Sequence, residues 1–299
     1  MSDESVRTAI RSDARLVVVE APAGCGKTHQ AADYAGSLSA VSGAQRTLIL
    51  THTHAACSVF ASRTKGAGSR VEIATIDSLI AGIAGVYYAG LGLPADTAAW
   101  VRQRKDGYSE LALKVAALLK RHPMIATAIA RRYPVVLCDE HQDSSGDQHA
   151  VVMALAGQGS RVRIFADPMQ RIFSDTPIKG ALPQWDWNAL TGAAQAFERL
   201  DFPHRWNRGG CPHLGLWTLK ARETLRNNGR IDLRSGLPDS VEVVFAENEA
   251  QTYMGIQFTL NQRRPIDDFE KNQSSLLVLT RYKDTVRAIR AMFLRRLPI

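Results

Sequence analysis

The chain has 299 residues, of which 45% are hydrophobic and 22% are charged. This is the composition of an ordinary soluble globular protein, and the length is enough for about two domains. The net charge of +8 favours a polyanionic partner, although a basic surface that only aids solubility has the same charge.

Cysteine usage and hydrophobic patterning exclude several classes of protein. Cys25, Cys57, Cys138 and Cys211 lie far apart and form no Cys-x-x-Cys pair, which argues against a zinc ribbon and a secreted disulfide framework. The one long uncharged stretch, 79–93, is short and glycine-rich for a membrane-spanning helix. The polar N-terminal residues do not resemble a signal peptide. We therefore expect a cytoplasmic protein with no membrane role.

Short apolar runs recur through the first two thirds of the chain. They are rich in leucine and β-branched residues with little alternation, as expected for parallel strands buried on both faces. Each run leads directly into glycine or polar residues, which would gather beyond the carboxyl ends of the strands. The pattern predicts an α/β fold with a parallel sheet whose strands are Leu16–Glu20, Thr47–Leu50, Val71–Ile76, Val135–Cys138 and Val162–Ala166.

Two other segments differ from these runs in their hydrophobic pattern and composition. Leu111, Val115 and Leu118 recur at helical spacing, which predicts a helical insertion over 79–133. A second change follows Trp185 and Trp187, so we expect a first lobe over 1–195 and another over 196–299. The second lobe would include a strand at Leu276–Leu279 and a basic amphipathic stretch from Val286 to Leu297.

The strongest local signal is the run Ala21-Pro-Ala-Gly-Cys-Gly-Lys-Thr, directly after the first strand. Glycines allow a tight turn whose N–H groups point at a phosphate, a lysine reaches the β- and γ-phosphates, and a threonine hydroxyl ligates magnesium. A chance glycine turn before a helix is the alternative. We predict a nucleotide site with an exposed Lys27, built from Ala23, Gly24, Cys25, Gly26, Lys27 and Thr28.

An acidic run, Asp139-Glu-His-Gln-Asp143, follows the fourth strand. A carboxylate at a strand end can hold Mg²⁺, and its neighbour can polarise the attacking water. Asp139 suits the metal role together with Thr28, and Glu140 suits the role of general base. The alternative is an acidic loop that only aids solubility.

Together these motifs resemble the UvrD/Rep/PcrA family of superfamily 1 DNA helicases, and they arrive in that family's order. The resemblance implies a RecA-like P-loop lobe, a helical insertion and a partial second RecA-like lobe. It covers residues 16–205, through Ala21–Thr28, Leu50–Cys57, Ala74–Leu79, Asp139–Asp143 with Gln148, Ala166–Phe173 and Leu200–Arg205.

The resemblance also implies roles for matched positions. Gln170 would sense the γ-phosphate, Arg205 would reach it from the second lobe, and Gln142 and His204 would contact the nucleotide. His204 stands where the family often has a tyrosine that packs on the base. Single-stranded DNA would be contacted by Thr53, His54, Thr75 and Phe173. Phe173 can instead be a core residue, and a metal site at His52 and His54 would lack further ligands.

Some features depart from the family pattern. Residues 1–15 contain no glutamine that would read adenine, and the motifs that complete the second lobe have no counterpart, as in a fragment or a shortened form. The first hypothesis is an ATP- and Mg²⁺-dependent helicase or translocase moving 3′ to 5′ on single-stranded or tailed duplex DNA. It can have a protein partner, such as a nuclease or another repair or phage-defence component. The alternative is a nucleotide-regulated DNA- or partner-binding subunit that does not unwind DNA itself.

Overall fold

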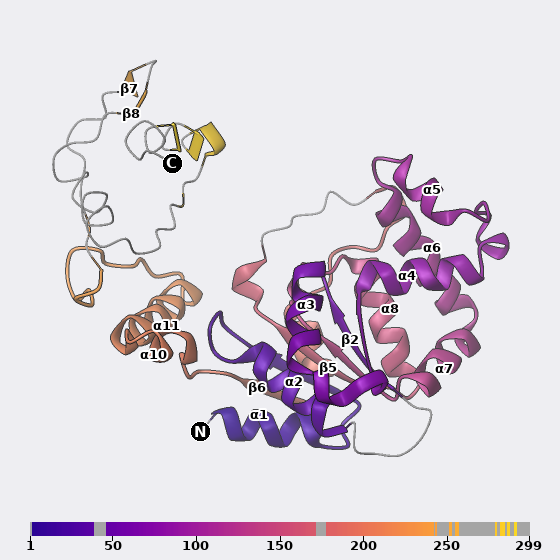
Figure 1. Cartoon of the computed structure of the whole chain (residues 1–299), viewed down its shortest axis with the longest axis horizontal. Coiled ribbons are helices and arrows are strands. Elements are labelled where there is room, and N and C mark those ends of the chain that lie inside the picture. The colour runs from indigo at the N-terminus through magenta and orange to yellow at the C-terminus, as the bar shows by residue number, and fades with distance from the viewer. Residues whose placement is uncertain are drawn as a thin grey trace. The chain divides into compact units, whose positions relative to one another are not determined.

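The computed structural model describes residues 2–38, 46–171 and 178–241, together with isolated positions beyond them (243, 251–252, 255–256, 279, 282–284, 286–287 and 290–291). The chain divides into two compact units, Met1–Leu219 and Lys220–Ile299. The first unit contains the sheet (Figure 1). It also contains both of the cavities discussed below.

A six-stranded parallel sheet forms the centre of the first unit, with the strand order β3-β2-β4-β5-β1-β6. Five strands coincide closely with the predicted apolar runs, which confirms the α/β fold with a parallel sheet. The strands are β1 (Leu16–Glu20), β2 (Thr47–Thr51), β3 (Val71–Thr75), β4 (Val135–Cys138), β5 (Arg161–Ala166) and β6 (Ala196–Arg199).

Each face of the sheet packs against its own set of helices. Alternate residues of β1 divide between the faces: Val18 belongs to one core cluster, whereas Val17 and Val19 belong to the other. The first cluster includes residues of α4 (Ile76–Val86), α5 (Thr97–Arg102), α6 (Gly107–Arg121), α7 (Pro123–Arg132), α8 (Gly146–Gly157) and α9 (Trp187–Ala193). The second includes residues of α1 (Ser2–Arg11), α2 (Lys27–Leu38) and α3 (His54–Arg63). This double cover explains why the strands read as continuous apolar runs.

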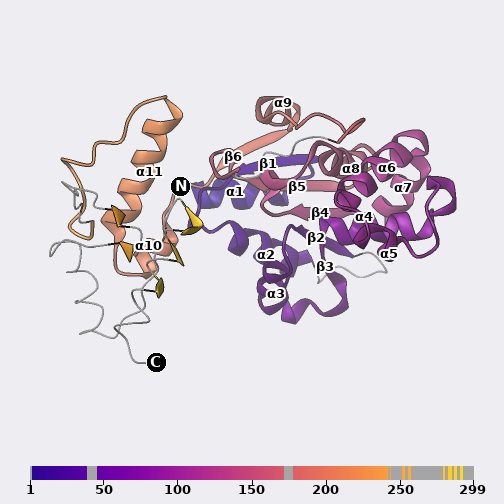
Figure 2. The same cartoon turned by 90° about the horizontal axis from the view of Figure 1, so that it is seen from above.

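The segment expected as a helical insertion is helical. Helices α4 to α7 connect β3 to β4 and lie together beside the sheet in both views (Figures 1 and 2). Their buried residues, among them Ile80, Leu111, Val115 and Leu119, join the core cluster on one face of the sheet. The insertion is therefore packed as part of the first unit.

The first unit extends past the predicted boundary at 195. Strand β6 pairs in parallel with β1, with Val18 opposite Phe197, and forms one edge of the sheet. The following helices, α10 (His204–Arg208) and most of α11 (Pro212–Arg226), also precede the end of this unit at Leu219. Strand β6 thus belongs to the sheet of the first unit. The assignment of residues 196–299 to a partial second lobe stays a prediction.

Little of the second unit is described. A two-stranded antiparallel pair joins β7 (Gln251–Thr252) to β8 (Gly255–Ile256). The strand predicted at Leu276–Leu279 and the basic stretch from Val286 to Leu297 lie outside the described residues, apart from isolated positions. Among the helices that the structure describes, none has the length and apolar character needed to cross a membrane.

The register brings the polar ends of the strands to one edge of the sheet. Thr51 lies opposite Thr75 at the ends of β2 and β3, and the Asp139 N–H donates to Leu50 O at 2.9 Å. The Ala21 N–H similarly donates to Ala166 O at 2.9 Å, which joins the end of β1 to that of β5. In an open parallel sheet this edge is where ligands bind.

Candidate active site

The loop between β1 and α2 folds as a tight turn that ends on a helix N-terminus. Gly24 and Gly26 have φ angles of 75° and 91°, in the region that favours glycine. Helix α2 begins at Lys27, and Gln30 N donates to Gly26 O at 3.0 Å as the first turn closes. The free N–H groups and the dipole of this helix end favour an anion.

A second reason for these glycines comes from α10, which packs directly against the loop. A Cβ atom on Gly24 would lie 2.5 Å from Trp206 Cζ3 and 2.9 Å from Arg205 Cβ, and one on Gly26 would lie 3.1 Å from His204 Cδ2. The Arg205 N–H also donates to Gly24 O at 3.0 Å. The loop is therefore shaped both by its own turn and by a helix about 180 residues away in sequence.

A cavity of about 440 Å³ opens between the loop and α10. Its charged lining residues are four cations and one carboxylate, so the cavity is suited to a polyanion such as a nucleotide phosphate chain. The lining residues are Pro22, Ala23, Gly24, Gly26, Lys27, Thr28, His29, Arg63, Glu140, Gln170, His204, Arg205 and Arg208. Nine of these residues were predicted from the sequence to bind the nucleotide or to act in catalysis, and the structure brings them to one cavity.

Lys27 is buried, contrary to the expectation that it lies exposed at the loop. Its ammonium pairs with the carboxylate of Glu140, and Lys27 Nζ lies 3.7 Å from Asp139 Oδ1. These two carboxylates are the anions that the Lys27 ammonium contacts. The side chain is therefore held inside the site by charge rather than left in solvent.

Asp139 has the environment of a metal ligand. Its carboxylate is buried, and Asp139 Oδ1 accepts no hydrogen bond from any described group. Burial raises the pKa of Asp139 to about 6, with Lys27 opposing this rise and Glu140 adding to it. A buried oxygen without a donor is suited to a cation, and Thr28 supplies a hydroxyl in the adjoining cavity. Asp139 and Thr28 therefore fit a Mg²⁺ ion.

Glu140 is held in an uncommon backbone conformation. Its φ and ψ angles are 53° and 38°, in the left-handed region, which costs a non-glycine residue roughly 1–3 kcal/mol. Its side chain lines the cavity and accepts a hydrogen bond from Gln142 Nε2 at 2.7 Å. Burial raises the pKa of Glu140, but Lys27 and the Gln142 bond outweigh it and lower the pKa below its usual range. Glu140 is thus ionised and aimed at the cavity, as a general base requires.

Gln142 joins Glu140 to the end of β5. The Gln142 side chain is buried, and its Oε1 accepts from the Asp167 N–H at 3.0 Å while its Nε2 donates to Glu140. Asp167 in turn accepts a hydrogen bond from Gln170 Nε2, and Gln170 lines the cavity. The structure places Gln142 behind the base rather than on the cavity wall, and its expected contact with a nucleotide stays a prediction.

Asp3 is a site residue that sequence reasoning missed. Its Oδ2 lies 2.7 Å from His204 Nε2, and Gln30 Nε2 donates to Asp3 O at 3.3 Å. The Phe202 ring packs edge-on against the His204 ring, with the two ring centroids 4.6 Å apart. Asp3 Oδ1 and Gln30 Oε1 are buried without a hydrogen-bond partner among the described groups. Since Asp3 lies in α1, far from every motif, no local pattern marks it.

Arg208 and Trp206 were also missed. Both lie on α10 beside the predicted Arg205, and Arg208 lines the cavity. Arg63 lines the same cavity from the end of α3. Arg208 could have been found from its spacing, because it lies one helical turn after the predicted Arg205.

The residues expected to contact DNA follow β2 and β3. Thr53 is the exposed N-cap of α3 and accepts from Ala56 N at 3.1 Å, and His54 is the exposed first residue of that helix. Thr75 is buried, and its hydroxyl caps α4 by accepting from Ser78 N at 3.1 Å. Phe173 lies outside the described residues. These DNA contacts stay predictions, with Thr75 occupied by a helix cap.

No described group of three or more His, Cys, Asp or Glu side chains is placed to hold a metal ion. His52 instead pairs through Nε2 with Ser144 Oγ at 3.0 Å, which links the end of β2 to the segment after β4. The site therefore depends on Asp139 and Thr28, whose remaining ligands would be water and phosphate oxygens.

One family model is similar to part of the first unit. Residues 96–175 match the UvrD/REP helicase N-terminal domain, which confirms the resemblance inferred from the motifs. No curated protein matches the sequence.

Among solved structures, the Pif1 helicase from Candida albicans matches with a TM-score of 0.40 and 15% sequence identity. The match covers 93% of this chain and 55% of the Pif1 chain, so the chain spans about half the length of that protein.

Proposed function

From the resemblance of this chain to UvrD-like helicases of superfamily 1, we propose that it is the nucleotide-binding part of an ATP-driven DNA helicase or translocase. The observation that carries the proposal is the cavity between the β1–α2 loop and α10, where Lys27 and three arginines face Glu140. Cations placed around a single carboxylate suit a phosphate chain that is cleaved by water.

Each residue of the cavity has a distinct task in this proposal. The loop amides and the N-terminus of α2 hold the phosphate chain, and Lys27 neutralises its charge. Thr28 and Asp139 would hold Mg²⁺, which offsets the negative charge that develops on the transferred phosphoryl group. Arg205, Arg63 and Arg208 supply further positive charge from α10 and α3.

The pairing of Lys27 with Glu140 gives the site a dependence on its substrate. The ammonium of Lys27 pairs with the Glu140 carboxylate. Phosphate oxygens would compete for Lys27 and release the Glu140 carboxylate toward water. Gln142, which donates to Glu140, would keep the carboxylate in place through this exchange. We therefore expect phosphate binding to free the base.

A change at the nucleotide can be transmitted to the residues expected to contact DNA through the hydrogen-bonded groups that adjoin Glu140. Gln142 contacts Asp167, which holds Gln170, and Arg171 Nε donates to Gln142 O at 3.1 Å. His52 and Ser144 connect the same segment to the end of β2, next to Thr53 and His54. Single-stranded DNA bound at these ends is the partner that we propose, with movement from 3′ to 5′ implied by the family resemblance.

The experiment measures phosphate release from MgATP with and without an oligothymidine strand. We expect the strand to accelerate hydrolysis, and the Lys27→Ala variant to show neither basal nor stimulated release. A chain that binds ATP and single-stranded DNA without hydrolysis in either condition would instead be a nucleotide-regulated binding subunit. Hydrolysis that is unaffected by DNA would contradict the motor assignment.

A further inference from the structure

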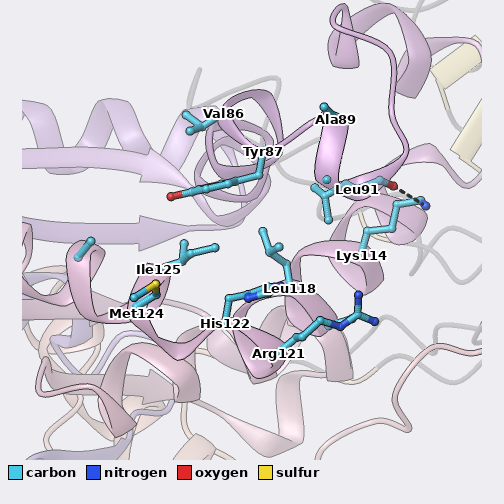
Figure 3. A pocket seen from close by; sticks show the side chains of 13 residues that line it. Val86, Tyr87, Ala89, Leu91, Lys114, Leu118, Arg121, His122, Met124 and Ile125 are labelled. Atoms are coloured by element: carbon cyan, nitrogen blue, oxygen red, sulfur yellow. Dashed lines mark hydrogen bonds between the residues drawn. The ribbon is translucent and has the colours of Figure 1, made fainter.

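A second cavity, of about 790 Å³, lies in the helical segment between β3 and β4. One wall is formed by the end of α4 and the turn Ala89–Leu91, and the other by α6 and α7 (Figure 3). None of its lining residues has a part in the phosphate site. We call this cavity the α4–α7 groove; its size lies within the range of binding sites, about 300–1,000 Å³.

The floor of the groove is anchored in the protein core. Leu91 and Leu118 pack against the main core cluster, and Ile125 belongs to it. Lys114 Nζ donates to Leu91 O at 3.1 Å and so ties α6 to the turn on the opposite wall, as the dashed line in Figure 3 shows. A groove with such a floor is preformed, which lowers the cost of ordering it when a partner binds.

The walls expose large apolar side chains. Met124 is 77% exposed and Val86 is 71% exposed, and Tyr87 is also partly open to solvent. Figure 3 shows Tyr87 across the groove from His122 and Met124, with Leu118 and Ile125 between them. Apolar side chains gathered around a concave floor are typical of surfaces that bind another protein.

The charges at the groove are of one sign. Its charged lining residues are Lys114 and Arg121, both toward the end away from Met124 in Figure 3, and no aspartate or glutamate lines it. Arg121 forms no ion pair with any described residue, and Lys114 bonds to a carbonyl group rather than a carboxylate. An acidic ligand would therefore gain the attraction of both cations without displacing an existing partner.

We propose that the α4–α7 groove binds a segment of a partner protein that carries large apolar side chains flanked by aspartate or glutamate. The apolar side chains enter between Tyr87 and Met124, and the carboxylates meet Arg121 and Lys114. Most of the lining is apolar, whereas surfaces that bind nucleic acid are more polar and more densely basic. A second copy of this chain carries the same net charge of +8, which disfavours it as the occupant.

A displayed library of short random peptides, selected on the full chain without nucleotide, tests the proposal independently of ATP hydrolysis. Selected sequences are synthesised with a fluorescent label and their affinities measured by anisotropy. The variants are Arg121→Glu and Met124→Glu, with Val86→Glu as a second change on the opposite wall. Lys120→Glu is the matched control, because Lys120 is exposed beside Arg121 and does not line the groove.

We expect the selected peptides to combine acidic residues with at least two large apolar ones. Affinity should fall by about tenfold or more in Arg121→Glu, Met124→Glu and Val86→Glu, and stay within about twofold of the parent in Lys120→Glu. Peptides whose acidic residues are replaced by lysine should regain affinity for Arg121→Glu, which a merely unfolded variant would not show.

Two results would overturn the proposal. The first is the absence of any selected peptide whose binding depends on the three groove positions. The second is a labelled oligothymidine that loses affinity in Met124→Glu and Arg121→Glu alike while keeping it in Lys120→Glu, since that pattern assigns the groove to nucleic acid.

Discussion

At the scale of single residues, Glu140 has a strained backbone conformation, and its carboxylate is held by a cation and a hydrogen-bond donor. Its left-handed φ of 53° places the carboxylate on the cavity wall, where Lys27 and Gln142 hold it. Such strain persists where the surrounding structure fixes it, and it is common at functional sites. The backbone conformation therefore supports the role of Glu140 independently of its motif.

The Glu140→Gln variant should bind MgATP and fail to hydrolyse it. The amide keeps the size of the side chain and can still accept from Gln142, but it cannot take a proton from water. We expect hydrolysis to fall by about 10²–10⁴-fold, the range for loss of a general base. Phosphate release measures the loss of hydrolysis, and calorimetric titration measures the retained binding of MgATP. Glu110→Gln, on α6, is the control, and a parental rate in Glu140→Gln would move the base elsewhere.

Three rings form a second residue-scale feature beside the site. His149 stacks on Trp185 with centroids 5.1 Å apart, and His149 Nδ1 lies 2.9 Å from His141 Nε2. Arg171 lies over the Trp185 ring and adds a positive charge near the pair. Burial lowers the pKa of His149 to about 4, from an ordinary value of about 6.5. The folded protein thus keeps this histidine neutral at mildly acidic pH.

The depressed pKa of His149 predicts a loss of stability in mild acid. Between pH of about 6.5 and 4 the unfolded chain binds a proton that the folded chain does not, so stability is full above this window and falls as pH decreases through it. The loss is up to about 3 kcal/mol at the lower end. Thermal unfolding at pH 7.5 and 5 measures it. The difference should shrink in His149→Gln but not in the exposed His213→Gln; equal differences would contradict the assignment.

The phosphate site was predictable from sequence to the extent that it is local. Gly24, Gly26 and Lys27 follow one another directly after a strand, and the acidic pair follows another. The contacts of Asp3 with His204 and of Trp206 with Gly24 were not predictable, because each joins segments that are far apart in sequence. Burial of Lys27 was missed because its two anionic partners directly follow β4, and only the folded sheet brings them to Lys27.

At the scale of elements, helix α1 is attached to the sheet by a buried arginine. Arg163 on β5 is fully buried, and its guanidinium donates to Ile10 O, Ser12 O and Ala14 O at 2.7, 2.6 and 2.6 Å. These carbonyls lie at and just beyond the C-terminal end of α1, where a cation also meets the negative end of the helix dipole. The same helix carries Asp3, so this anchor also supports His204.

Arg163→Met should destabilise the protein by about 2–4 kcal/mol, because three buried carbonyl groups lose their donor. Chemical denaturation measures the change in the free energy of unfolding. Arg161→Met is the matched control on the same strand: Arg161 pairs with the exposed Asp13, and its loss should cost less than about 1 kcal/mol. Similar losses in both variants would show that Arg163 does not anchor α1.

Strands buried on both faces were predicted well, whereas the edge strand β6 was not. Residues of β1 and β2 are buried throughout, so their sequences read as apolar runs. Strand β6 alternates between half-buried and exposed positions, and Glu198 and Arg199 give it a polar character. Its place in the sheet depends on pairing with β1, which a local pattern does not encode.

At the scale of the whole molecule, the net charge of +8 and the cationic phosphate cavity favour polyanionic ligands. From this charge and the family resemblance we expect DNA to be such a partner. Binding that neutralises phosphates releases counterions, so its strength must depend on salt. Charge and resemblance thus lead to one measurable property of the 299-residue chain.

Binding of a labelled oligothymidine should weaken steeply as salt rises. Neutralising three phosphates of a single strand gives a slope of about −2 in log affinity against log salt, and further contacts make it steeper. Titrations at several sodium chloride concentrations, repeated with mixed-sequence strands of equal length, measure the slope and the sequence preference. A flat response, or a strong preference for one sequence, is inconsistent with backbone-directed binding.

The measurement that most directly tests the account is calorimetric titration of MgATP into the parent chain, Lys27→Ala and Glu140→Gln. We expect saturable binding of one nucleotide to the parent and to Glu140→Gln. We expect no measurable binding to Lys27→Ala that remains folded by circular dichroism, because the loop then lacks its phosphate cation. Equal affinity of Lys27→Ala and the parent would show that ATP binds elsewhere and would contradict the assignment of the cavity.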